Sequence, residues 1–277
     1  MTSILLIQCA DRIGLVATLA RTMAEAENNI VSMREHVDGE NDMFFCRIEL
    51  QGPPLQAGLI GRLKTLLPYG ALVTYDPNRI KRTVLLVTRE HHCLGDLLIR
   101  NHFRTLPIDI QAVIGNHEVL ADITNKFNIP FHYISHEGKS KGEFEQEILE
   151  RLETYQPDLL VLAKFMRILS PSFVASYPHG IINIHHSFLP AFIGANPYRQ
   201  AYERGVKLIG ATAHFVTNDL DEGPIISQQI IPVDHSYNAG EMARAGKEVE
   251  QAVLARAVRL VAEDRVLVWG NKTVVFE

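Results

Sequence analysis

From residue 83 onward, short apolar segments of strand length alternate with segments in which apolar residues recur at helical spacing. The expected strands are residues 83–88, 108–114, 131–134 and 159–162, and the expected helices are residues 94–103, 119–127 and 142–155. This alternation is typical of a doubly wound, Rossmann-like α/β domain with a mostly parallel sheet. Ligands of such sheets bind beyond the carboxyl ends of the strands, so functional residues should directly follow strands.

The first 76 residues have a different rhythm. The expected elements, in order, are a strand at 4–7, a helix at 13–26, strands at 30–37 and 43–50, a helix at 55–66 and a strand at 69–75. The order βαββαβ predicts a ferredoxin-like α+β sandwich. Because residues 77–82 are polar and contain a proline, we interpret them as a linker between domains 1–76 and 83–277. A long helix at 239–263 and two short strand-like runs should end the chain.

Composition excludes several classes of protein. The chain has 277 residues, of which 47% are hydrophobic, and a formal net charge of −5, so a basic nucleic-acid-binding surface is not expected. No apolar run reaches the roughly 18 residues of a membrane span. The N-terminus has no cationic start before its apolar run, and the three cysteines are far apart without a CxxC motif. We therefore expect a cytoplasmic protein with reduced thiols that binds neither nucleic acid nor membrane.

Polar side chains occur at strand ends in the second domain. Asn183 and His185 close an apolar strand, and they share one face because they are two positions apart. Thr212 and His214 share a face in a later strand, and Asp221 lies in an acidic Asp-x-Gly turn. Singly, each has an ordinary structural explanation as a turn former or a satisfied core group. Together, an amide, an imidazole and a carboxylate are the groups that acyl transfer requires.

Several long motifs then carry a resemblance to a known family. They are the Asn-Ile-His-x-Ser run at 183–187, the Leu-Pro-x-x-x-Gly-x-x-Pro run at 189–197, Gly-x-Thr-x-His at 210–214, Asp-x-Gly-x-Ile-Ile at 221–226, Phe-Met-Arg-Ile-Leu-Ser at 165–170 and the ending at 271–276. These resemble the folate-dependent formyltransferase superfamily. The chain is most similar, nearly end to end, to its formyltetrahydrofolate deformylase family, which joins an N-terminal ACT domain to a formyltransferase-like hydrolase domain. Histidine at position 186, where the superfamily commonly has proline, is typical of that family.

The resemblance implies an activity, a substrate and site residues. The activity is hydrolysis of 10-formyltetrahydrofolate to formate and tetrahydrofolate, which supplies formate for purine biosynthesis and balances folate pools, without a metal or other cofactor. Asn183, His185 and Asp221 become the catalytic residues. The implied substrate-binding residues are Met166, Arg167, Ile168, Leu169, Thr212, His214, Val216, Asn218 and Asp219.

For the first domain, the resemblance implies a homo-oligomer and an amino-acid effector. The effector residues are Asp11, Arg12, Gly14 and Leu15, at the entrance of the first helix. The alternative is that Asp11 only caps this helix.

The turn after the first strand of the second domain bears on the choice of acceptor. Residues 88–96 contain one glycine, two adjacent histidines and the carboxylates Glu90 and Asp96. In transferases with a phosphorylated acceptor this turn is rich in glycine and serine, and its N–H groups can approach a phosphate. Here the carboxylates are expected to repel a phosphate, which favours water as the acceptor. A transferase with an amine acceptor and a catalytically idle amino-acid sensor are the alternatives. His91, His92 and Cys93 suggest no metal site, since adjacent side chains diverge.

Overall fold

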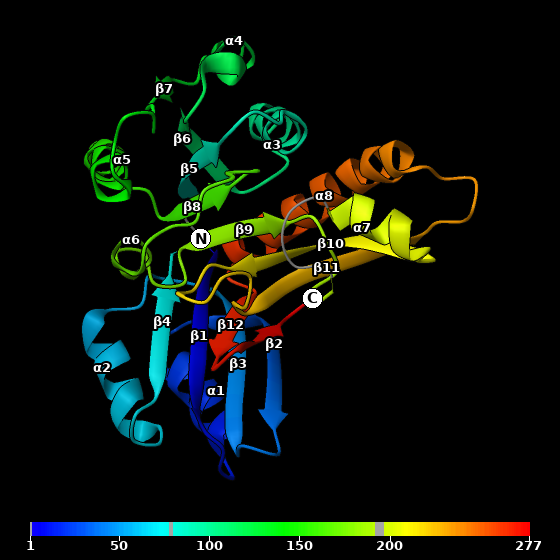
Figure 1. Ribbon diagram of the computed structural model, residues 1–277. Helices are drawn as coiled ribbons and strands as arrows, with labels where there is room; N and C mark the ends of the chain where they lie inside the picture. Colours follow the sequence, from blue (N-terminus) through cyan, green and yellow to red (C-terminus); the bar gives the residue numbers. More distant parts are fainter. Residues whose placement is uncertain (1, 78–79, 192–196) are drawn as a thin grey trace. The chain divides into compact units, whose positions relative to one another are not determined.

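The computed structural model describes residues 2–77, 80–191 and 197–277. The chain forms two compact units (Figure 1). The first contains residues 1–79 together with Glu263–Trp269 and Val274–Glu277, and the second contains Ile80–Ala262 and Gly270–Thr273. Among the helices of the described part of the chain, none is long and apolar enough to cross a membrane.

The first unit has the element order that the sequence pattern predicts. Its elements are β1 (Thr2–Ala10), α1 (Leu15–Glu25), β2 (Asn29–Asp38), β3 (Met43–Gln51), α2 (Ala57–Leu66) and β4 (Leu72–Asp76). The strands form an antiparallel sheet in the order β2-β3-β1-β4. Successive side chains of a strand point to opposite faces, and Leu5 and Ile7 pack with Leu19 and Met23 of α1 in one buried cluster.

The opposite face of this sheet is covered by the C-terminal hairpin, β12 (Val266–Trp269) and β13 (Lys272–Val275). Phe45 is fully buried there against Leu267 and Phe276. The Arg47 side chain donates hydrogen bonds to the main-chain carbonyls of Asp264 and Glu263, just before this hairpin, at 3.0 and 3.1 Å. The predicted division at residues 77–82 therefore differs from the observed units, because the last residues of the chain supply core to the first unit. Strand β5 also starts inside the predicted linker, at Lys81.

The second unit is an α/β fold with a mostly parallel sheet, as predicted. Its elements are β5 (Lys81–Val87), α3 (His92–His102), β6 (Ile108–Gly115), η1 (Glu118–Leu120), α4 (Ala121–Asn125), β7 (Phe131–Tyr133), α5 (Lys141–Tyr155), β8 (Leu159–Leu162), α6 (Pro171–Ala175), β9 (Ile181–His185), α7 (Pro197–Arg204), β10 (Leu208–Phe215), β11 (Ile225–Pro232) and α8 (Ala239–Ala262). The sheet order is β11-β10-β9-β8-β5-β6-β7. Strands β5 to β9 pair in parallel, and β10 and β11 are antiparallel.

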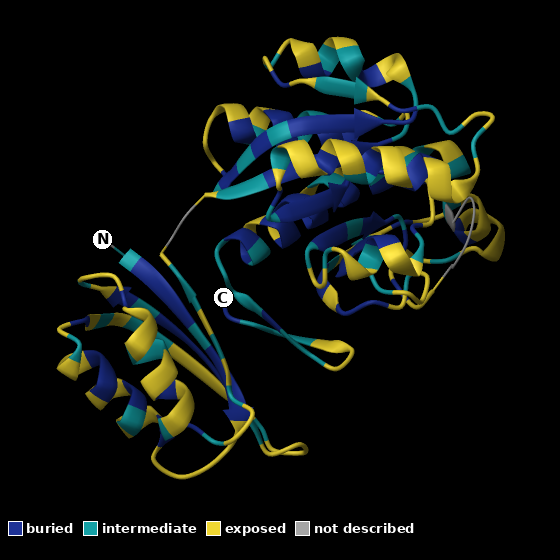
Figure 2. Ribbon diagram, turned by 90° about the vertical axis from the view of Figure 1, so that its left-hand side faces the viewer, coloured by how far each residue is buried: buried dark blue, intermediate teal, exposed yellow. Residues whose placement is uncertain are grey.

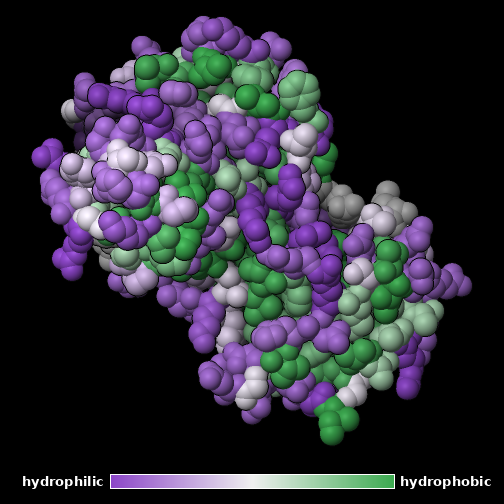
Figure 3. Space-filling model, turned by 90° about the vertical axis from the view of Figure 1, so that its right-hand side faces the viewer, coloured by the Kyte–Doolittle hydropathy of each residue, from purple (hydrophilic) through white to green (hydrophobic). Residues whose placement is uncertain are grey.

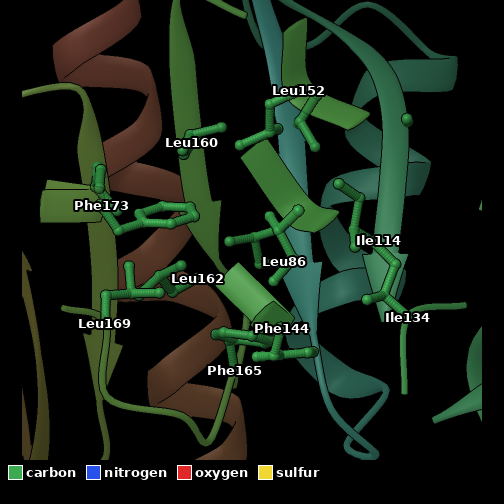
Figure 4. Close-up of a cluster of buried hydrophobic side chains, with 14 residues drawn as sticks. Leu86, Ile114, Ile134, Phe144, Leu152, Leu160, Leu162, Phe165, Leu169 and Phe173 are labelled. Atoms are coloured by element: carbon green, nitrogen blue, oxygen red, sulfur yellow. The ribbon is translucent and has the colours of Figure 1, made fainter. Parts of the chain in front are cut away.

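Helices cover this sheet, so its central strands are buried along most of their length, as the buried strands between exposed helix faces show (Figure 2). On one side, Leu86, Leu160 and Leu162 of the sheet pack against Phe144 of α5 and Phe173 of α6 (Figure 4). Ser140 and Glu143 form a capping box that fixes the start of α5.

The sequence pattern does not predict the short helices correctly. The helix expected at 119–127 is a 3₁₀ turn followed by the five-residue α4. Helices α6 and α7 were not predicted, because five and eight residues are too short to establish a helical periodicity.

We predict that Phe45→Ala destabilises the first unit by about 3–5 kcal/mol, the usual cost of removing a buried phenyl ring. Phe103→Ala is the matched control, because that ring is 69% exposed. Thermal unfolding followed by circular dichroism measures both. If Phe45→Ala melts at the temperature of the unchanged protein, the hairpin does not pack on this face.

Candidate active site

The ends of three neighbouring strands bring the predicted catalytic residues together. β9 pairs in parallel with β8 and antiparallel with β10, and this register sets His214 opposite Asn183 and Thr212 opposite His185. The loops that follow β8 and β10 lie over the same edge and line a cavity of about 290 Å³ with Asn183 and His185. A cavity beyond the carboxyl ends of parallel strands is where this class of sheet binds ligands.

Asp221 reaches His185 from the loop after β10. Its Oδ2 lies 3.2 Å from His185 Nδ1, and its Oδ1 lies 3.7 Å from His214 Nε2. The following glycine makes this turn possible, because a Cβ on Gly223 would lie 1.8 Å from the carbonyl oxygen of Phe215. The Asp-x-Gly spacing thus has a steric cause: the glycine lets the loop fold tightly against β10.

The Asp221 carboxylate is held in its charged form. Burial by itself raises its pKa, but the hydrogen bond from His185 and the nearby His214 ring outweigh burial and hold the pKa of Asp221 well below its usual range. A fixed negative charge at this distance stabilises positive charge on the His185 ring. The pair is therefore suited to hold and move a proton.

His214 orients Asn183. Its Nδ1 lies 2.9 Å from the carbonyl oxygen of Phe215, which can only accept, so Nδ1 carries the proton. In the neutral ring Nε2 is then an acceptor, and the Asn183 amide nitrogen donates to it at 3.3 Å. This assigns the amide nitrogen of Asn183, a residue that lines the cavity.

The second ring nitrogen of His185 is the unusual atom of the site. His185 Nε2 is buried and has no hydrogen-bond partner within the described ranges, while Nδ1 is engaged by Asp221. A buried polar atom without a partner costs free energy, so it indicates a ligand that supplies one. His185 lines the cavity, where such a ligand would lie.

Eight of the nine predicted substrate-binding residues line this cavity, namely Met166, Arg167, Ile168, Leu169, His214, Val216, Asn218 and Asp219. Met166 and Ile168 are 56% and 61% exposed, so apolar side chains face the opening. Thr212 is the exception and a correction. It is fully buried outside the cavity lining, and its hydroxyl donates to Ser187 and accepts from Leu189 and Gln228. Thr212 fixes the loop after β9 instead of contacting a ligand.

Sequence reasoning missed a buried ionic cluster beside the site, which we call the Lys164–Glu250 cluster. Lys164 Nζ lies 3.1 Å from Glu250 Oε2, which His92 Nε2 approaches to 2.8 Å. The hydroxyl of Tyr198 donates to the other Glu250 oxygen at 2.7 Å. Burial alone raises the pKa of Glu250, yet hydrogen bonds from His92 and Tyr198 and the charge of Lys164 lower it to about 2. No spacing rule connects residues so far apart in the chain.

This cluster also bears on metal binding. His92, Cys93 and Glu250 each offer a ligand atom within 4.8 Å of the others, so a third donor does reach the histidine–cysteine pair. The ammonium of Lys164 already pairs with the Glu250 oxygen, and burial raises the pKa of the Cys93 thiol well above its usual value. Both features oppose a cation, because a metal needs a free carboxylate and a thiolate.

The acceptor turn is organised differently from the sequence expectation. Glu90 pairs with Lys247 at 2.9 Å and Asp96 pairs with Arg100 at 2.7 Å. Their charges are compensated, so the expected repulsion of a phosphate by two free carboxylates is wrong.

In the first unit, the predicted effector residues lie at the start of α1. Gly14 is the N-cap residue with φ of 89°, and no side chain caps the helix, so Asp11 does not cap it. Arg12 donates to the carbonyl oxygen of Leu66 at 2.5 Å. Leu15 is only 2% exposed, so its side chain belongs to the core, and an effector contact at this residue would use its main-chain N–H.

We predict that Glu250→Gln removes a pH-dependent part of the stability. A pKa of about 2 lies below that of a free glutamate, so Glu250 stabilises the folded protein above about pH 4, and this contribution is lost as the pH falls to 2. The shift corresponds to about 3 kcal/mol. Melting curves from pH 2 to pH 7 should show the variant well below the unchanged protein at pH 7 and approaching it at low pH. Glu248→Gln, exposed on the same helix, is the control; a constant difference across the range would contradict this assignment.

Comparison with known proteins places these features in a family. Residues 81–258 match the Formyl transferase family model. The chain is 52% identical to a formyltetrahydrofolate deformylase of Haemophilus influenzae, covering 98% of each chain, and 45% identical to one of Bacillus subtilis, covering 98% of this chain and 93% of the other. Residues 192–196 of the Leu-Pro-x-x-x-Gly-x-x-Pro motif lie outside the described residues.

The solved structures that resemble this chain indicate the same family as the sequence relatives. The crystal structure of a formyltetrahydrofolate deformylase from Pseudomonas syringae has a TM-score of 0.95 and 41% identity, and covers 100% of this chain and 94% of the other. A glycinamide ribonucleotide transformylase from Symbiobacterium toebii has a TM-score of 0.70 and 30% identity, and covers 73% of this chain and 97% of the other. Since the deformylases match both units while the transformylase matches about three quarters of the chain, the chain belongs to the family of formyltetrahydrofolate deformylases.

Proposed function

We propose that this protein hydrolyses 10-formyltetrahydrofolate to formate and tetrahydrofolate in the cavity beyond β8 and β9. The observation that carries the proposal is His185, held by Asp221 through Nδ1 with its buried Nε2 unpartnered at the cavity. Family membership supplies the substrate, and this arrangement supplies the groups that the hydrolysis needs.

The first step is attack of a water oxygen on the formyl carbon, which forms a C–O bond and an oxyanion. Asn183 and protonated His185 donate hydrogen bonds to that oxyanion. Each well-placed donor lowers the activation free energy by roughly 3–4 kcal/mol. The neighbouring Asp221 carboxylate stabilises the imidazolium. Both donors reach one atom because they lie on the same face of β9.

In the second step the tetrahedral intermediate collapses. The bond from the formyl carbon to N10 breaks, and a proton from the former water moves to N10 through the Asp221–His185 pair. Formate leaves with one oxygen from water, tetrahydrofolate leaves with an N10 proton, and the second water proton passes to solvent. No metal or redox group takes part in this scheme, because the folate is the substrate and the protein supplies the proton-transfer groups.

The folate ring system binds between the loops that follow β8 and β10. Their apolar side chains provide walls, and the main-chain groups of residues 216–219 provide fixed hydrogen-bond partners, as is usual for small-molecule sites. Asp219 and Asn218 lie at the rim beside Asp221.

The first unit serves as an ACT domain of the ferredoxin-like type, which assembles subunits and binds an amino-acid effector near Asp11, Arg12 and Gly14. Ile13 is fully exposed and Val16 is 42% exposed at the same helix start. Hydrophobic residues also interrupt the hydrophilic surface in several places (Figure 3). Exposed apolar side chains beside the proposed effector site suit burial by a second copy of the chain.

The enzyme works in the cytoplasm and supplies formate for purine synthesis.

Substitutions in the Asp221–His185 pair test the catalytic assignment. His185→Ala and Asp221→Asn should each lower formate release from 10-formyltetrahydrofolate, without any added acceptor, by about 100-fold or more. His235→Ala, an exposed histidine of a surface loop, should leave the rate unchanged. Turnover of either site variant at the unchanged rate removes that residue from the mechanism.

A second prediction concerns assembly. Ile13→Asp places a charge on the surface proposed to meet a second subunit, so the mass in solution should fall when it is measured by light scattering. Val119→Asp, at a residue 64% exposed in the second unit, should keep the mass of the unchanged protein. An unchanged mass for Ile13→Asp would place the subunit contacts elsewhere.

A further inference from the structure

Lys164 combines two features that are each costly. Its backbone has φ of 63°, in the left-handed region that favours glycine, and its residue is only 4% exposed. This backbone conformation is unfavourable for a residue with a side chain. Burial removes a strongly hydrated ammonium group from water. A lysine at this position is therefore unfavourable both in its backbone conformation and in its burial.

The Lys164 side chain is surrounded by charged groups that pair with it. Its ammonium pairs with Glu250 at 3.1 Å and lies 3.9 Å from Glu90. Both Glu250 oxygens are occupied, one by Lys164 and His92 and the other by Tyr198. A buried ion pair adds little net stability compared with well-packed apolar side chains, so stability alone does not account for this arrangement.

The cluster reaches the catalytic cavity through Lys164. Lys164 lines that cavity together with Asn183, His185 and the neighbouring His186. The backing of this cluster is tight, since a Cβ on Gly246 of α8 would lie 2.1 Å from the Tyr198 hydroxyl. Burial and the Lys164 charge lower the pKa of His186 to about 4, so at neutral pH this ring adds no second positive charge beside His185.

We propose that the Lys164 side chain, locked by Glu250, closes the catalytic cavity against nucleophiles larger than water and thereby makes the enzyme a hydrolase. The inference rests on the proposed deformylase reaction and names the residue that selects its acceptor. With the lysine present, only water reaches the formyl carbon. With the space open, the nitrogen of a primary amine forms the new bond to that carbon, the bond to N10 breaks, and one amine proton moves to N10.

Lys164→Gly tests the proposal, because glycine suits the backbone at φ of 63° and the substitution opens the space of a whole side chain. The variant is incubated with 10-formyltetrahydrofolate and excess glycinamide, and N-formylglycinamide and formate are counted by mass spectrometry. We expect the ratio of formylglycinamide to formate to rise at least tenfold over the unchanged enzyme. Arg104→Gly is the matched control, since it also replaces a long cation at positive φ but lies on the exposed loop after α3.

Two further variants separate volume from charge and guard against misfolding. Lys164→Met keeps the length of the side chain without the charge, so its product ratio should stay at that of the unchanged enzyme. Lys164→Asn opens most of the same space with a residue that tolerates the left-handed region, and it replaces the glycine variant if that variant does not fold. Its ratio should also rise.

The outcomes distinguish this inference from the function on which it rests. If the unchanged enzyme releases no formate, the proposed function fails. If it releases formate while the folded glycine or asparagine variant hydrolyses without forming any amide product, the Lys164 inference is wrong. A folded variant that neither hydrolyses nor transfers also overturns it and gives Lys164 a direct part in catalysis.

Discussion

The ion pair between Asp221 and His185 is the interaction on which the site depends. It joins the end of a parallel strand to the loop that follows β10, and the pairing of β9 with β10 brings that loop to the end of β9. His214 in β10 lies opposite Asn183 and fixes its amide. One strand register therefore positions the carboxylate, the imidazole and the amide together. The same register explains why the hydroxyl of Thr212, also on β10, forms hydrogen bonds with the loop after β9.

A second, buried set of charges lies behind this pair and gives the two walls of the cavity different characters. The wall made by the loops after β8 and β10 is apolar and open, which suits a flat ring system. The wall at Lys164 carries an ammonium group that is paired with the buried Glu250. The protein shares its formyltransferase fold with the glycinamide ribonucleotide transformylase of Symbiobacterium toebii. Under the proposal for Lys164, what can approach the formyl carbon in this protein is set by that side chain, while Asn183, His185 and Asp221 act on the formyl group.

Much of this could be predicted from the sequence because the deciding signals are local. Apolar runs placed the strands, and the two-residue spacing of Asn183 and His185 placed them on one face. The ionic cluster could not be found in this way, because His92 and Glu250 are 158 residues apart and meet only when α8 packs on α3. Thr212 was predicted to bind the substrate because a strand pattern shows which residues share a face of the sheet. The pattern does not show which loop covers that face. Glu90 and Asp96 looked like free charges, since their partners Lys247 and Arg100 are visible only in the fold.

The central claim is that water, activated at the Asp221–His185 pair, is the nucleophile. The most direct measurement is a single turnover of 10-formyltetrahydrofolate in ¹⁸O-labelled water, with the formate analysed by mass spectrometry. The account predicts one ¹⁸O atom in each formate released, and a rate of labelled formate production that depends on His185. Formate that carries no label, or a formyl group that leaves the site attached to another acceptor, would contradict it.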